Sequence, residues 1–118
     1  ALSAAATTGG GIRLVQQVFA DRDIEEVRRL ALRLSEKSRH LVLFGVSGDK
    51  GRLVLARSAD TPGDMAALLK AVSHAFGGGG GGQPHLAQGG GMDAGRLEEA
   101  LHYALTTYRT QMAEKGAE

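Results

Sequence analysis

The stretch LVLFGVSGDKGRLVLA, residues 41–56, decides the fold. Its first part, Leu41–Val46, is a continuous apolar run of strand length, which is typical of a central strand covered on both faces. Residues 47–51 (Ser-Gly-Asp-Lys-Gly) have the composition of a turn, and Leu53–Ala56 is a second apolar run. The stretch therefore predicts two antiparallel strands joined as a hairpin in the middle of a sheet.

The residues before this hairpin predict a strand followed by a helix. Ile12–Ala20 places apolar side chains alternately on two faces, as a strand does. After a turn at residues 21–23, apolar residues recur at helical spacing, which predicts an amphipathic helix over residues 24–38. A strand, a helix and a second strand in this order predict a right-handed parallel crossover.

The residues after the hairpin predict two more helices. Thr61 and Pro62 are the expected N-cap and first residue of a core-facing helix, whose apolar spacing runs from Met65 to Phe76. Gly77 should end that helix, and Asp93 should cap a last one. The chain is thus predicted to be one small α/β domain with a mixed β-sheet. Its expected order is strand, helix, strand, strand, helix, glycine loop, short strand and helix, with the helices packed on the sheet.

The composition suits one globular domain and excludes several classes of protein. The chain has 118 residues, and no apolar run approaches the ~20 residues that a membrane span needs. The absence of cysteine excludes a disulfide scaffold, a thiolate zinc site and a cysteine nucleophile, and it fits a reducing cytosol. Lys and Arg number 14 against 13 Asp and Glu, so an anionic partner must be held by a local patch or by the backbone.

The domain boundaries follow from the small residues at the start. We expect residues 1–11 to be the disordered end of a linker and residues 12–115 to form the domain. We also expect the chain to be a piece of a longer protein, because its opening residues have the composition of a linker.

Residues 76–91, FGGGGGGQPHLAQGGG, form a glycine window that holds nine of the 18 glycines. Ordering the six consecutive glycines costs roughly 3–6 kcal/mol relative to alanine, which is comparable with the net stability of a small domain. An ordered run therefore needs a use for backbone without side chains, such as an anion nest or direct contact with a ligand. A flexible linker and a tight structural turn are the alternatives. The run is neither a Walker loop nor a dinucleotide fingerprint, because no Gly-Lys-Ser/Thr follows it and it follows a helix.

Three linked features carry a family resemblance. Arg57-Ser58 ends a strand, the next helix ends in Phe76 and the glycine run, and an Ala-Gln-Gly-Gly sequence at residues 87–90 follows. Over residues 12–112 the chain resembles the DHH-associated domain, and more narrowly the C-terminal domain of alanyl-tRNA synthetase. In DHH-type phosphodiesterases a histidine directly follows the glycine run. Here Gln83 and Pro84 separate the run from His85, which favours the synthetase branch.

The resemblance implies a cytoplasmic, tRNA-binding accessory domain of an alanine–tRNA ligase. Such a domain holds alanine tRNA for aminoacylation and editing by other domains and supports dimer contacts. It implies no cofactor and no metal in this domain, with ATP, magnesium and zinc used elsewhere in the parent enzyme. The residues expected to bind nucleic acid are Arg57, Ser58, Gly77, Gly78, Gly79, Gly80, Gly81, Gly82, His85, Gln88, Gly89, Gly90 and Arg96.

Three alternatives stay open from the sequence. The chain lacks the zinc-binding editing motif, the class II ATP-site motifs and the Asp-His-His metal cluster, so no catalytic centre is recognised in it. It can be the C-terminal domain of a stand-alone alanyl-tRNA editing hydrolase, or the substrate-binding domain of a DHH phosphodiesterase. It can also be a dimerisation module with an inert loop. The sequence upstream of Ala1 separates the first two from the synthetase.

Basic side chains elsewhere have structural explanations beside functional ones. Arg57 can bind phosphate through its forked guanidinium, or it can pair with Asp60 or Asp64 on the surface. Arg29, Arg33 and Lys37 form one basic stripe on the first helix, a pattern that is usually a solvated face.

The histidines and aromatic residues narrow the chemistry further. The four histidines are scattered without a ligand pair, which argues against a structural zinc site. His85 is the one we expect to stack on a base or to bond phosphate. The five aromatic residues are too few for a broad stacking platform, so recognition by shape and backbone is expected.

Overall fold

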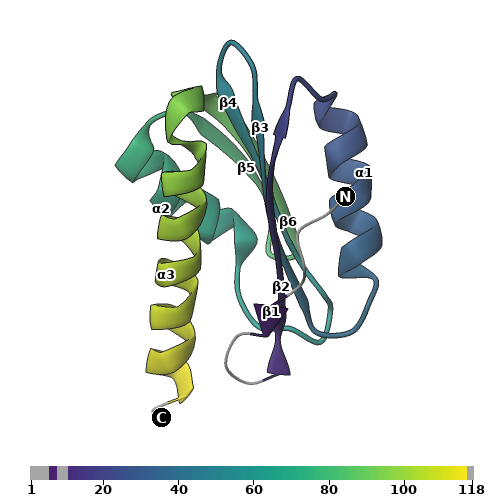
Figure 1. The fold of residues 1–118 in the computed structure, drawn as a ribbon. Coiled ribbons are helices and arrows are strands. Elements are labelled where there is room, and N and C mark those ends of the chain that lie inside the picture. The colour runs from purple at the N-terminus through teal and green to yellow at the C-terminus, as the bar shows by residue number, and fades with distance from the viewer. Residues whose placement is uncertain (1–5, 8–10, 117–118) are drawn as a thin grey trace.

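The computed structural model describes residues 6–7 and 11–116, in which six strands form one mixed sheet ordered β1-β2-β3-β4-β6-β5 (Figure 1). The strands are β1 (Ala6–Thr7), β2 (Arg13–Ala20), β3 (His40–Ser47), β4 (Gly51–Arg57), β5 (Gly79–Gln83) and β6 (Leu86–Met92). The helices are α1 (Ile24–Ser35), α2 (Met65–Phe76) and α3 (Leu97–Gly116), with a short 3₁₀ turn at Ala94–Arg96. Figure 1 shows α1 on one face of the sheet and α2 and α3 on the other.

The central strands confirm the expected α/β architecture. β2 and β3 pair in parallel on either side of α1, and Leu14 lies opposite Leu41. β3 and β4 are antiparallel, with Leu43 opposite Leu55. Both strands are buried along most of their length because helices cover both faces, as the continuous apolar runs require.

Two apolar layers, one on each face of the sheet, hold the helices in place. Under α1, Val27 and Ala31 pack with Phe44, and the rings of Phe19 and Phe44 meet edge to face at 5.1 Å. The layer under α2 and α3 is larger and includes Leu41, Leu43, Leu55, Leu69, Ala87, Leu101 and Tyr108. Ala87 and Leu86 lie in opposite layers, so β6 belongs to the core on both faces.

Two helix boundaries differ from the sequence prediction. α1 ends at Ser35 rather than near residue 38, and Arg39 lies at a φ of 57°, outside helical geometry. The N-cap of α2 is Asp64 rather than Thr61, because Gly63 has a φ of 121° that no helix accepts. The Asp64 carboxylate accepts hydrogen bonds from the N–H groups of Ala66 and Ala67 instead. Gly77 ends α2 and Asp93 caps the turn into α3, as predicted.

The expected disorder of residues 1–11 is wrong for Ala6 and Thr7. These two residues form β1, which pairs antiparallel with β2 opposite Leu14 and Arg13. Residues 1–5 and 8–10 lie outside the described residues. Within the part of the chain that the structure describes, no helix is both long and apolar enough to span a bilayer.

Candidate nucleic-acid interface

Most of the glycine run is the edge strand of the sheet, not a loop, since Gly79–Gly82 belong to β5 while Gly77 ends α2. β5 pairs antiparallel with β6 from Gly79 opposite Gly90 to Gln83 opposite Leu86, and all five residues of β5 are exposed. The expectation of a glycine loop is therefore wrong, whereas the short strand expected after it is present as β6. The anion nest is wrong as well, since successive N–H groups of an extended strand point to opposite edges. β5 has a neighbour on one side only, so half of its N–H and C=O groups face away from the sheet.

Steric crowding requires glycine at only every second position of this run. A Cβ at Gly78, Gly80 or Gly82 would collide with the main chain of β6, for example 2.6 Å from the Ala87 Cα at Gly82. A Cβ at Gly79 or Gly81 would meet nothing within 4 Å, and neither residue has a positive φ. The fold thus explains Gly78, Gly80 and Gly82, but it leaves Gly79 and Gly81 without a structural reason to lack a side chain.

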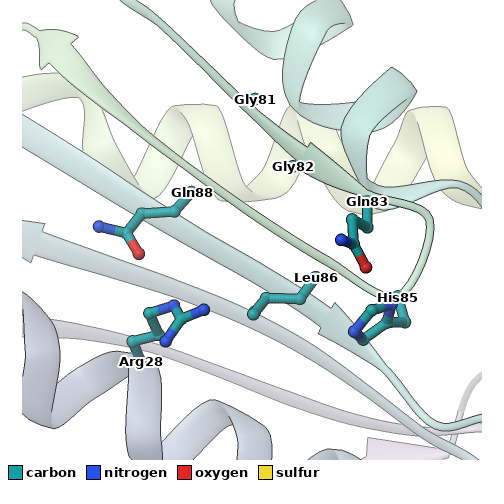
Figure 2. Close-up of a pocket in the computed structure, with 7 residues that line it drawn as sticks. All are labelled: Arg28, Gly81, Gly82, Gln83, His85, Leu86 and Gln88. Carbon is teal, nitrogen blue, oxygen red and sulfur yellow. The ribbon is translucent and has the colours of Figure 1, made fainter.

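A hollow of about 310 Å³ opens on the α1 side of the hairpin (Figure 2). It is lined by Arg28, Gly81, Gly82, Gln83, His85, Leu86 and Gln88. Figure 2 shows Arg28 beside Gln88 at one end and His85 beside Gln83 at the other, with Leu86 between them. No Asp or Glu lines this hollow, whereas the neighbouring hollow around Arg57 contains Glu36 and Asp60. Cationic, amide and backbone groups are thus combined around an apolar floor.

Arg28 is the charged residue of this hollow that the sequence analysis missed. It follows the buried Val27 on α1 and is itself partly buried, so its side chain leaves the helix beside the sheet and extends toward β6. The predicted stripe lies elsewhere, because Arg29 and Arg33 are exposed and Lys37 lines the hollow around Arg57. The signal for Arg28 was its position next to the apolar stripe of the helix, where a long side chain extends over the sheet.

Of the predicted residues, Arg57 and Ser58 hold the backbone together. Arg57 donates from Nε to the Gly63 carbonyl (2.6 Å) and from Nη1 to the Ser58 carbonyl (3.1 Å). The Ser58 side chain is buried at 2% exposure, where its hydroxyl donates to the Lys37 carbonyl and accepts from the N–H of His40. A buried, fully engaged hydroxyl cannot contact nucleic acid directly, so the prediction of Ser58 as a contact residue is wrong. Among the ion pairs of the described residues, none joins Arg57 to Asp60 or Asp64.

Backbone hydrogen bonds from Arg57 and Met65 fix the closed end of the hairpin. The N–H of Arg57 donates to the His85 carbonyl (3.0 Å), and the N–H of Met65 donates to the Pro84 carbonyl (2.8 Å). The β5–β6 turn is therefore tied to the end of β4 and to the first residue of α2. Exposed His85 is held by its backbone while its ring faces the hollow.

Asp60 stabilises the adjacent turn, and this gives a pH prediction. Its carboxylate accepts from the Ser38 hydroxyl and from the N–H of Arg39 (2.8 Å), and these bonds lower its pKa below the ordinary value. Because the folded pKa is the lower one, the stabilisation is present above the unfolded pKa of about 3.9 and is lost as pH falls through the folded pKa. We expect the stability of wild type to fall below about pH 4 more steeply than that of Asp60→Asn, as measured by urea denaturation at several pH values. Asp49→Asn, the same change on the β3–β4 turn, should follow wild type; equal curves for all three proteins would contradict the assignment.

The remaining predicted residues divide between the two sides of β5. Gly81, Gly82, His85 and Gln88 meet in the hollow beside Arg28. Arg96 lies at the start of the hairpin, where its guanidinium stacks 4.6 Å from the centre of the Phe76 ring. Its partner Glu99 (3.0 Å) raises the pKa of Arg96 by hydrogen bonding and by charge. Gly89 must be glycine for the fold, since a Cβ there would lie 2.6 Å from the Gly79 carbonyl oxygen.

Comparison with known proteins places this geometry in a family. The model of the DHHA1 domain matches residues 11–109, nearly the whole chain. The chain belongs to the DHHA1 domain family. This DHHA1 domain is 35% identical to the alanine–tRNA ligase of Methanothrix thermoacetophila over 92% of its length, and 39% identical to that of Pseudomonas savastanoi pv. phaseolicola over 88%. It spans only 12% of either relative.

A solved structure supports the same relationship. The C-Ala domain of the Aquifex aeolicus alanyl-tRNA synthetase superposes with a TM-score of 0.75 at 27% identity, covering 86% of this chain and 94% of that one. The DHHA1 domain described here is therefore homologous to one domain of alanine–tRNA ligases, and the resemblance on residues 12–112 is confirmed.

Proposed function

We propose that this DHHA1 domain is the tRNA-binding accessory domain of an alanine–tRNA ligase. It holds alanine tRNA for aminoacylation and editing, which other domains of the parent chain carry out in the cytoplasm, and it supports dimer contacts. The homology to alanine–tRNA ligases supports the parent enzyme. The contact surface is the exposed strand β5 with the hollow that Arg28 and His85 line.

The observation that carries the proposal is the pair Gly79 and Gly81. Neither needs glycine for steric reasons, and each weakens a strand by roughly 0.5–1 kcal/mol relative to alanine. Because the fold does not explain this loss of strand stability, we infer that the bare backbone itself contacts a ligand. N–H groups on the free edge can donate to phosphate oxygens, and C=O groups can accept from ribose 2′-hydroxyls.

The distribution of charge supports an anionic ligand at this edge. The chain as a whole carries a net charge of only +1, yet the hollow beside β5 contains Arg28 and no acid. The hollow at the β3–β4 turn differs because its cations Arg22, Lys50 and Arg52 share the lining with the acids Asp21 and Asp49. A cation without a competing carboxylate, next to free backbone donors, is suited to a phosphodiester chain.

Replacement of Arg28 tests the proposal. Arg28→Ala should weaken binding to an alanine tRNA transcript by about tenfold at low salt and should reduce the salt slope of log K by about 0.7–0.9, the value for one lost phosphate contact. Filter binding at several salt concentrations measures both quantities. Arg28→Lys should restore most of the affinity because it keeps the charge.

Arg29→Ala is the matched control, because it removes the same charge from the neighbouring, exposed position of α1. It should leave the salt slope within about 0.2 of wild type, since its side chain does not line the hollow. Equal losses for the two alanine variants would mean that only the overall charge matters. Failure of the wild-type domain to bind the alanine tRNA transcript would overturn the function itself.

A further inference from the structure

We propose a second phosphate-binding subsite on the opposite side of β5, formed by Lys70, Ser73 and His74 of α2 together with the backbone of Gly78–Gly80. The inference rests on the proposed function, because it assigns a second contact for the same RNA backbone. The ligand class is a phosphodiester group of an RNA strand that passes over the free edge of the sheet.

The geometry is a hollow of about 380 Å³ between α2 and the first half of β5. Lys70 and His74 are exposed and one helical turn apart, and Ser73 is partly buried beside them. No Asp or Glu is among its lining residues. Ammonium, imidazole and hydroxyl groups can all donate to phosphate oxygens, so the side chains and the strand backbone offer a complete set of donors.

The distribution of polar residues on α2 makes this arrangement specific. Lys70, Ser73 and His74 are the three polar side chains of Met65–Phe76, and all three line the hollow. The other positions of the helix hold Ala, Leu, Met, Val or Phe, including the exposed Ala67 and Ala75. A helix that only needed a solvated outer face would place charges at such exposed positions. The polar side chains of α2 instead all lie beside Gly78–Gly80, which have no side chains.

The two hollows are separate sites on one strand. The first is lined by Arg28 of α1 with Gly81 and Gly82, and the second by α2 with Gly78–Gly80. The helices lie on opposite faces of the sheet (Figure 1). One phosphate therefore cannot occupy both hollows. An RNA backbone that crosses the edge of β5 presents successive phosphates to the two sides in turn.

The test compares Lys70→Ala, His74→Ala and their double variant with Lys50→Ala, which removes the same charge from the β3–β4 turn, beside a hollow that Asp21 and Asp49 also line. Binding of the alanine tRNA transcript is measured at several salt concentrations. Lys70→Ala should lower affinity about five- to tenfold and reduce the salt slope by about 0.7–0.9, additively with Arg28→Ala. His74→Ala should lower affinity further with a smaller change of slope, and Lys50→Ala should match wild type.

The outcomes separate this inference from the function on which it rests. Loss of affinity in Arg28→Ala with no change in the α2 variants overturns the second subsite and leaves the function standing. Loss in Lys70→Ala no larger than in Lys50→Ala has the same meaning. Failure of wild type to bind the transcript overturns both. Amide spectra provide a second measurement, because the transcript should shift the Gly78–Gly80 signals in wild type and shift them less in the Lys70→Ala, His74→Ala double variant.

Discussion

Alanine at both Gly80 and Gly82 is expected to separate β5 from β6, whereas alanine at both Gly79 and Gly81 is expected to leave the hairpin intact. The first pair directs each Cβ into the main chain of β6. The Cβ at residue 80 would meet Gln88 and Gly89, and the Cβ at residue 82 would meet Leu86 and Ala87. Overpacking of this kind costs about 1–3 kcal/mol per site, and a backbone neighbour cannot move aside as a side chain can. The second pair points into open space.

Amide hydrogen exchange and urea denaturation measure the difference. In Gly80→Ala, Gly82→Ala the amides of β5 and of the facing residues of β6 should lose protection, and the unfolding free energy should fall by about 2–6 kcal/mol. In Gly79→Ala, Gly81→Ala the free energy should rise by about 0.5–1 kcal/mol per site. Equal effects of the two pairs would contradict the alternating steric requirement.

The outward positions also allow a functional test without damage to the fold. Gly79→Val, Gly81→Val should keep the hairpin, since neither Cβ has a neighbour within 4 Å. The added side chains should still cover the free edge and weaken binding of the alanine tRNA transcript at least tenfold, the size expected when several backbone contacts are lost together. Unchanged affinity in this folded variant would exclude β5 as the contact.

Tyr108→Ala is expected to cost about 3–5 kcal/mol of unfolding free energy, as a large aromatic side chain removed from a core does. Tyr108 is 2% exposed, and its ring packs against Gly63, where a Cβ would lie 2.7 Å from the ring Cε1. Its hydroxyl donates to the Pro62 carbonyl (2.7 Å), which joins α3 to the segment before α2. Burial raises the pKa of Tyr108, so the hydroxyl keeps its proton and remains a donor.

Tyr108→Phe separates the ring from its hydroxyl. It should cost about 1–2 kcal/mol, the value of one partly buried hydrogen bond, while the ring continues to fill its site. Urea denaturation of both variants gives the comparison. Since the same segment is held by the bond from Arg57 to Gly63, binding of the tRNA transcript by Tyr108→Phe should stay within about twofold of wild type. A phenylalanine variant as unstable as the alanine one would contradict the packing argument.

The parts of the fold with side-chain patterns were predictable from the sequence. The apolar runs at residues 41–46 and 53–56 predict the central strands, and the spacing from Met65 to Phe76 predicts α2 within its observed bounds. The N-cap of α2 was misplaced because Thr61, Asp64 and Pro62 are all acceptable near a helix start. The φ of Gly63 decides between them, and the Tyr108 ring occupies the space that a side chain at Gly63 would need.

The site was predictable only in part, for a related reason. A run of glycines has no side-chain period, so nothing in its sequence distinguishes a strand from a loop. β5 forms because β6 supplies its hydrogen-bond partners and α2 lies against it. Both are tertiary contacts, which the local sequence does not reveal. Arg28 and Lys70 were missed because a basic residue on a helix acquires a role only through the strand that folds beside it. His85, Gln88 and the glycines were predicted from the family resemblance, and the structure gathers them along one edge.

A surface made of peptide groups has a consequence for the choice among RNAs. β5 presents the same two groups, N–H and C=O, at each repeat, and these groups cannot distinguish one nucleobase from another. Such a contact binds any RNA whose backbone can lie along β5, and it does not depend on the base sequence of that RNA. Under the proposed function, this domain increases the time that a tRNA stays on the enzyme, and the decision that the tRNA is one for alanine falls to parts of the parent chain that carry base-reading side chains.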